Sequence, residues 1–181
     1  MKKLVTILLL FISSLAFCAS LKPSELAAIQ VVEQFAQGCV MSFPHPDKFT
    51  EWLAQPGFRK LSSTEAKEYL GGYPGSAWSA QLGNSRFVLT SIDGSACNIF
   101  ANDLDETMTK NLIVGFLDYL KTQGATYQSK NVTPVAATAN QTSTSYAVSM
   151  DGQVVMNLIL TIAAPGNGKF QVALTASKAT T

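Results

Sequence analysis

The sequence predicts an α+β fold, in which a single domain has an antiparallel sheet of about six to seven strands with an N-terminal helix and one long central helix on one face. Three features predict it. Apolar side chains recur at helical spacing in two stretches, short strand-like segments fill most of the remainder, and glycine-containing turn dipeptides separate those segments. Strands that are joined by tight turns and interrupted by a helix are typical of such a sheet.

The first 20 residues have the three parts of an export signal peptide. Lys2 and Lys3 make a positive start, a run of about nine mostly apolar residues follows, and small residues end the segment. The run is shorter than the ~20 residues of a membrane span, so we expect cleavage and a periplasmic or secreted protein. The alternative is a lipoprotein processed at Cys18. Phe17 disfavours it, because the lipoprotein motif has a small side chain at that position.

Residues 21–181 are expected to form one exported domain, because neither a fixed-period repeat nor a long linker divides them. The whole chain has 13 Lys and Arg against 12 Asp and Glu, and loss of Lys2 and Lys3 leaves the domain near neutral. Nucleic acids and anionic membrane surfaces require a clear basic excess in their partners. We therefore expect neither as a partner. We also expect no transmembrane segment, because no later run is long and apolar enough.

The first half of this domain is predicted to be helical. After Pro23, apolar residues recur every three or four positions as far as Phe43 and form one face of an amphipathic helix, which the Pro-His-Pro segment 44–46 ends. A short helix is expected next. Ser62 and Glu65 then have the spacing of a capping box, which predicts the start of another short helix.

The second half is predicted to be mainly strands around one long helix. Asp103 and Glu106 have capping-box spacing at the expected start of that helix, and Gly124 is expected at its end. Asp93-Gly94 and Asp151-Gly152 predict hairpin turns, because such pairs tolerate the positive φ of tight turns. The segments with strand character are 77–82, 86–92, 96–101, 126–136, 142–150, 153–163 and 169–177.

Cys39 and Cys97 are the only cysteines that remain once the signal segment is removed. An exported protein enters an oxidising compartment, so we expect these two residues to form a disulfide. Cys39 lies on the apolar face of the first predicted helix and Cys97 lies in a predicted strand, so the bond would join helix to sheet. Two buried free thiols are the alternative. A redox role is not expected, because there is no C-x-x-C motif.

The sequence contains few residues with the chemistry of a catalytic or metal site. His45 is the only histidine, and no metal-binding spacing of Cys and His is present, so we expect no metal and no cofactor. G-x-S-x-G and phosphate-binding loop motifs are also missing. We therefore expect a non-catalytic domain that binds a protein, a peptide or an envelope component. The alternative is a hydrolase that uses carboxylates or an unrecognised catalytic dyad.

Tyr73 and Trp78 flank a turn that is rich in glycine and proline. Such a turn is needed wherever a helix leads directly into a strand, and a tryptophan beside it usually packs in the core. The alternative is that the two rings form a small aromatic surface for a ligand or peptide. Both interpretations stay open, and Tyr73 and Trp78 are the candidate binding residues of the sequence.

The segment from Phe35 to Ala101 carries four short motifs: Phe35-x-x-x-Cys39, Gly57-Phe58, Gly72-x-Pro74-Gly75-x-x-Trp78 and Gly94-x-x-Cys97. Together they resemble a family of small uncharacterised proteobacterial periplasmic proteins and lipoproteins. The resemblance implies export and two paired cysteines, and it implies no activity. The chain departs from the lipoprotein members in the motif around Cys18.

Overall fold

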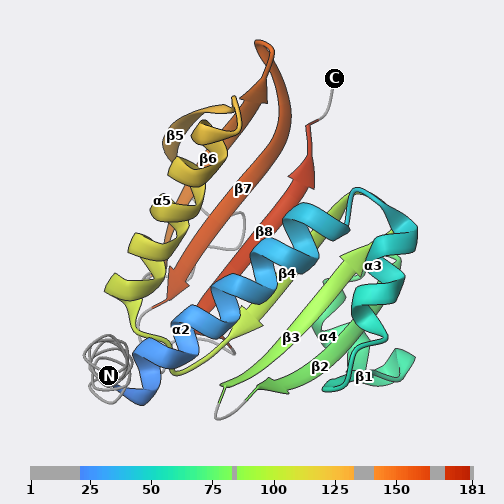
Figure 1. Ribbon diagram of the computed structural model, residues 1–181. Coiled ribbons are helices and arrows are strands. Elements are labelled where there is room, and N and C mark those ends of the chain that lie inside the picture. The colour runs from blue at the N-terminus through green and yellow to red at the C-terminus, as the bar shows by residue number, and fades with distance from the viewer. Residues whose placement is uncertain (1–20, 83–84, 133–140, 164–169, 180–181) are drawn as a thin grey trace, which may run out of the picture.

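The computed structural model describes residues 21–82, 85–132, 141–163 and 170–179, which form one eight-stranded sheet with helices on both faces (Figure 1). The expected signal peptide and the lipidation alternative at Cys18 lie outside the described residues. The strands are β1 (Phe58–Lys60), β2 (Gly75–Leu82), β3 (Ser85–Ile92), β4 (Ala96–Ala101), β5 (Thr126–Val132), β6 (Gln141–Met150), β7 (Gln153–Ala163) and β8 (Val172–Lys178). The helices are α2 (Pro23–Gln34), the π-helix η1 (Phe35–Ser42), α3 (Pro46–Leu53), α4 (Ser63–Leu70) and α5 (Glu106–Thr122).

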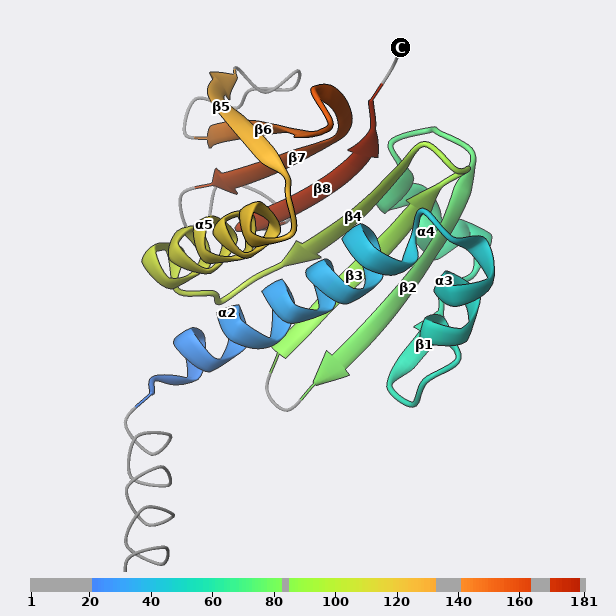
Figure 2. The same ribbon diagram turned by 45° about the horizontal axis from the view of Figure 1, so that its top comes forward.

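The strand order is β1-β2-β3-β4-β8-β7-β6-β5, and every neighbouring pair is antiparallel. The chain therefore builds two four-stranded meanders whose last strands, β4 and β8, pair at the centre of the sheet. A helix precedes each meander: α2 comes before the first and α5 before the second. These two helices pack against each other over the same face of the sheet (Figures 1 and 2).

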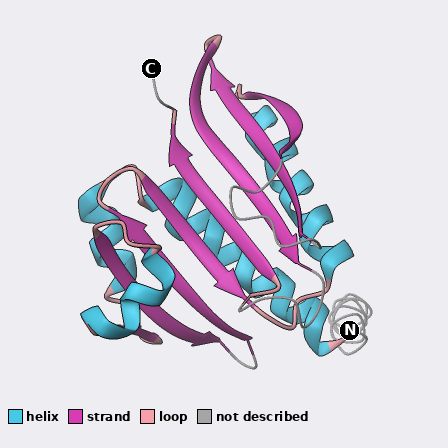
Figure 3. Ribbon diagram, turned by 180° about the vertical axis from the view of Figure 1, so that it is seen from behind, coloured by secondary structure: helices cyan, strands magenta, loops and turns pink. Residues whose placement is uncertain are grey.

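The expected antiparallel sheet is present, but it has eight strands instead of six to seven. Each of the seven expected segments contains a strand, although residues 133–136 and 169 of those segments lie outside the described residues. The additional strand is β1, whose three residues are too few to show a two-residue alternation. The expected arrangement of one N-terminal and one long central helix on one face is also incomplete. Four α-helices and η1 are present among the described residues, and α4 lies on the opposite face (Figure 3).

The main core lies between the sheet and the pair α2 and α5. Its centre is a row of apolar side chains that runs across neighbouring strands in register, from Leu89 through Ile99 to Leu174. Each of these three is at most 1% exposed. Leu117 of α5 and Val31 of α2 are fully buried against this layer. A second, smaller cluster packs under α4 on the other face.

Helix α5 begins at a different residue from the one predicted. Its N-cap is Asp105, whose carboxylate accepts a hydrogen bond of 2.7 Å from the backbone N–H of Met108, whereas Asp103 lies before the helix with a φ of 59°. The most buried positions of the helix are Thr109, Ile113 and Leu117. The apolar residues at four-residue intervals lie on the flank of this buried face and are partly buried: Met108, Leu112, Phe116 and Leu120.

Both predicted hairpins are confirmed, and they use different turns. Asp151 and Gly152 both have positive φ, 51° and 78°, as a two-residue turn with matched strand twist requires. At the other hairpin only Gly94 has positive φ, and the backbone N–H of Ser95 donates to the carbonyl of Ile92 at 2.8 Å. That turn is one residue longer, because Ile92 pairs with Ala96.

Candidate functional site

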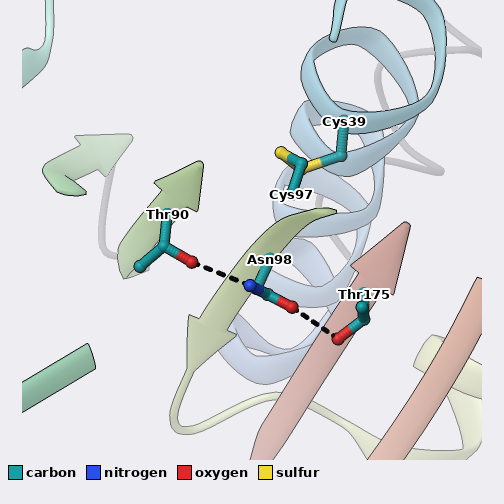
Figure 4. Close-up of a disulfide and its surroundings, with 5 residues drawn as sticks. All are labelled: Cys39, Thr90, Cys97, Asn98 and Thr175. Atoms are coloured by element: carbon teal, nitrogen blue, oxygen red, sulfur yellow. Dashed lines mark hydrogen bonds between the residues drawn. A yellow bond between two sulfur atoms is a disulfide. The ribbon is translucent and has the colours of Figure 1, made fainter. Parts of the chain in front are cut away.

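Cys39 and Cys97 form a disulfide with their Cα atoms 5.3 Å apart, which confirms the predicted bond (Figure 4). Both residues are fully buried. Cys39 belongs to η1, and Cys97 lies in β4, where it is paired in register with Ala176 of β8. The bond therefore joins the end of the first helical segment to the centre of the sheet.

The residue after Cys97 points to the other face of β4, as strand alternation requires (Figure 4). There the amide of Asn98 donates to the hydroxyl of Thr90 at 2.9 Å and accepts from the hydroxyl of Thr175 at 2.7 Å. Thr90 is fully buried and Asn98 is 8% exposed. This polar row joins β3, β4 and β8 on the face that α2 and α5 do not cover.

A groove lies on the same face, between α4 and strands β2, β3 and β4. It consists of two hollows, of about 560 and 470 Å³, that share Glu68, Tyr69, Arg86 and Val88. The shared residues show that the two hollows adjoin. We call the two hollows together the α4 groove.

One end of the α4 groove is aromatic. Tyr69 of α4, Phe100 of β4 and Phe170 just before β8 are all half-buried and contact one another. Their ring centroids are 4.9 to 6.4 Å apart, and the planes are tilted by 40 to 44°. We call these three side chains the aromatic cluster.

The sequence has two arginines, and both line the groove: Arg59 of β1 lines the larger hollow, and Arg86 of β3 lines both hollows. The Arg59 guanidinium donates to the carboxylate of Glu65 at 3.2 Å. Arg86 is exposed and takes part in none of the ion pairs found among the described residues. Its charge therefore faces the groove without a carboxylate partner from that part of the chain.

Glu65 has a structural role at the start of α4. Its carboxylate accepts from the backbone N–H and the hydroxyl of Ser62, each at 2.8 Å, which completes the predicted capping box. The Ser62 N–H, the Ser62 hydroxyl and then Arg59 lower the pKa of Glu65 from 4.5 to about 2. This carboxyl group is therefore ionised at neutral pH and already has hydrogen-bond partners.

The two candidate residues of the sequence occupy different environments. Tyr73 lies between α4 and β2 and is 65% exposed. Trp78 packs against the main core, edge to face with Phe49 at 6.1 Å, and the Lys60 ammonium lies 5.8 Å from its ring centroid. Trp78 therefore packs in the core, which was one of the two interpretations that the sequence left open. A joint role of both rings in binding stays a prediction.

Sequence reasoning missed the α4 groove because its residues come from separate segments. A signal was present in β3, where Arg86 falls on the same side of the strand as Val88 and Thr90. A charged residue on the same side of a strand as buried residues indicates a polar site at that face of the sheet. Within the described residues, no group of three or more His, Cys, Asp or Glu side chains is placed to hold a metal ion.

None of the helices in the described ranges has the length and apolar character of a membrane span. No protein-family profile, curated protein or solved structure matches this chain. The resemblance to periplasmic proteins and lipoproteins therefore stays a prediction.

Proposed function

We propose that this chain is an exported, non-catalytic binding domain of the cell envelope or the secreted fraction, and that its ligand lies in the α4 groove. One observation carries the proposal: in two adjoining hollows the groove places Arg86, which has no ion-pair partner among the described residues, next to an aromatic cluster. Sites for small molecules and short ligand segments usually have this size and this mixture of apolar rings with a few polar groups.

The physical chemistry of Arg86 supports binding. A guanidinium presents a planar set of donors that matches a carboxylate or phosphate, and it remains charged at every physiological pH. An exposed arginine gains little from a surface ion pair, and Arg86 makes none within the described residues, so its guanidinium is available to a ligand.

The hydrolase alternative is less well supported. Glycoside cleavage by two carboxyl groups needs one with a raised pKa that donates a proton near neutral pH. In the α4 groove the pKa of Glu65 is lowered instead, and its oxygens are held by Ser62 and Arg59.

The disulfide supports the proposed location. A fully buried bond between η1 and β4 requires oxidation during folding, and compartments outside the cytosol supply the oxidising conditions. The expected signal segment is consistent with the same destination. N-terminal sequencing of the native protein tests this part, and we expect the mature chain to begin at residue 19 to 21.

The binding site is tested by photo-cross-linking in native envelopes. A photoreactive amino acid replaces Gln81, which lines the groove, or Gln128, an exposed residue of the outer strand β5. We expect a discrete product from position 81 that disappears with Arg86→Ala, and no such product from position 128. Equal products from both positions, unaffected by Arg86→Ala, would contradict a ligand in the groove.

A further inference from the structure

We infer that the ligand of the α4 groove is an extended peptide with a carboxylate and an apolar side chain two residues apart. This inference rests on the proposed function and specifies its ligand class. It follows from the spacing of Arg86 and Phe100, from the tilt of the aromatic rings, and from the charges around Arg86.

The spacing comes from the register of the sheet. Arg86 and Val88 are two residues apart on β3 and point to the same face, and Val88 is paired in register with Phe100 on β4. Two residues along a strand cover about 6.7 Å, and neighbouring strands are about 4.8 Å apart, so the Cα atoms of Arg86 and Phe100 are separated by about 8 Å. Side chains two positions apart on an extended peptide are about 6.7 Å apart. The long arginine side chain covers the difference.

The aromatic cluster favours an apolar side chain over a sugar ring. A sugar stacks on a flat aromatic face, and coplanar rings would extend such a face over several sugar units. Here the three planes are tilted by 40 to 44° and come from α4, β4 and the approach to β8. Tilted rings provide edges and faces in several directions, which suits an aliphatic or aromatic side chain.

The charges favour a ligand with a single carboxylate. Of the two arginines that line the groove, Arg59 is bound by Glu65, whereas Arg86 takes part in none of the ion pairs among the described residues. Asp103 also lines the groove, and its carboxylate would repel a polyanion. A peptide with one acidic group can place it at Arg86 and keep neutral residues near Asp103.

The test uses the purified mature protein and fluorescein-labelled heptapeptides of glycine, serine and threonine. One peptide carries aspartate and phenylalanine separated by one residue, a second separates them by three residues, and a third has asparagine in place of aspartate. Fluorescence anisotropy measures the affinity of each. We expect the first peptide to bind at least tenfold more tightly than the other two.

Charge exchange at Arg86 provides the decisive variant, because this exposed side chain contributes little to folding. Arg86→Gln should weaken binding of the first peptide at least tenfold, and Arg86→Glu should reverse the preference to a peptide with lysine in place of aspartate. Lys130→Gln, on the outer strand β5, is the control and should bind as the unchanged protein does. Unaltered binding by Arg86→Gln, or indifference to spacing, would overturn the inference.

A linear oligosaccharide of uronic acids serves as the competing probe. If it binds in an Arg86-dependent manner and the peptides do not, the ligand class is wrong but the groove remains the site. If neither probe binds, and the photoreactive residue at position 81 also gives no specific product, then the proposed function itself fails.

Discussion

Cys39 and Cys97 are 58 residues apart in the chain, and the bond between them encloses α3, β1, α4, β2 and β3. Most of the α4 groove, including Arg59, Tyr69 and Arg86, lies within this closed loop. The bond is buried under η1 on the opposite face of the sheet from the groove. The covalent constraint therefore acts on the segment that carries the proposed site without touching the site itself.

Removal of this bond should destabilise the protein strongly. Closing a loop of this length reduces the entropy of the unfolded chain, which corresponds to about 4 kcal/mol. We expect Cys39→Ala with Cys97→Ala to lower the free energy of unfolding by about that amount in urea denaturation. Reducing agent should destabilise the unchanged protein to a similar extent and leave the double variant unaffected. Free thiols in unreduced, denatured protein would contradict the bond.

Gly38 and Gly115 give a matched pair of glycine substitutions in helical segments. A Cβ added at Gly38 in η1 would overlap the six-membered ring of buried Trp52, whereas one added at Gly115 in α5 meets no atom within 4 Å. We expect Gly38→Ala to lower the free energy of unfolding by about 1–3 kcal/mol through overpacking. Gly115→Ala should raise it by about 0.5–1 kcal/mol, because alanine is the better helix former. Equal effects would show that η1 does not pack on Trp52 in this way.

The parts of the fold that sequence analysis predicted correctly depend on local chemistry. Asp151-Gly152 defines its own turn through positive φ, and Ser62 with Glu65 defines the start of α4 through reciprocal hydrogen bonds. Cys39 and Cys97 could be paired because the third cysteine, Cys18, falls in the expected signal segment. Each of these features is decided by a few neighbouring residues or by elimination.

The parts that were missed depend on tertiary structure. Helix η1 continues α2 with the N–H of Phe43 donating to the carbonyl of Gly38, a five-residue spacing that an apolar repeat does not distinguish from an α-helix. The location of α4 on the second face depends on its tertiary contacts with β2 and β3, which its own sequence does not reveal. The groove joins Tyr69 to Phe170, and no local pattern connects residues so far apart in the sequence.

The polar row on the second face of the sheet should contribute to stability. Replacing Asn98 with alanine leaves the hydroxyls of Thr90 and Thr175 without the amide that joins them. Since Thr90 is fully buried, we expect Asn98→Ala to lower the free energy of unfolding by about 1–3 kcal/mol. Asn111→Ala, on the exposed side of α5, is the control and should change it little. A loss no larger than that of the control would contradict the bonded row.

Glu65 should make the protein sensitive to acid in a defined pH range. Its pKa is about 2 in the folded protein and 4.5 ordinarily, so folding favours the ionised form. The resulting stabilisation is complete above pH 4.5 and is lost as the pH falls from 4.5 towards 2. We expect a carboxyl NMR titration of Glu65 to have its midpoint near 2, and a midpoint near 4.5 would contradict the capping box.

Two variants relate this titration to the hydrogen bonds that cause it. Ser62→Ala removes the hydroxyl donor but keeps the backbone N–H, so it should raise the pKa of Glu65 only part of the way to 4.5. Glu65→Gln removes the titrating group, so the unfolding midpoint of this variant should fall less steeply than that of the unchanged protein between pH 4.5 and 2. Glu51→Gln, on the exposed side of α3, is the control and should follow the unchanged protein.

Because Glu65 also holds Arg59, peptide binding by Glu65→Gln at neutral pH reports whether the freed Arg59 competes with Arg86 for the ligand carboxylate. We expect the i, i+2 peptide to remain preferred in this variant, because Arg86 and Phe100 are unchanged.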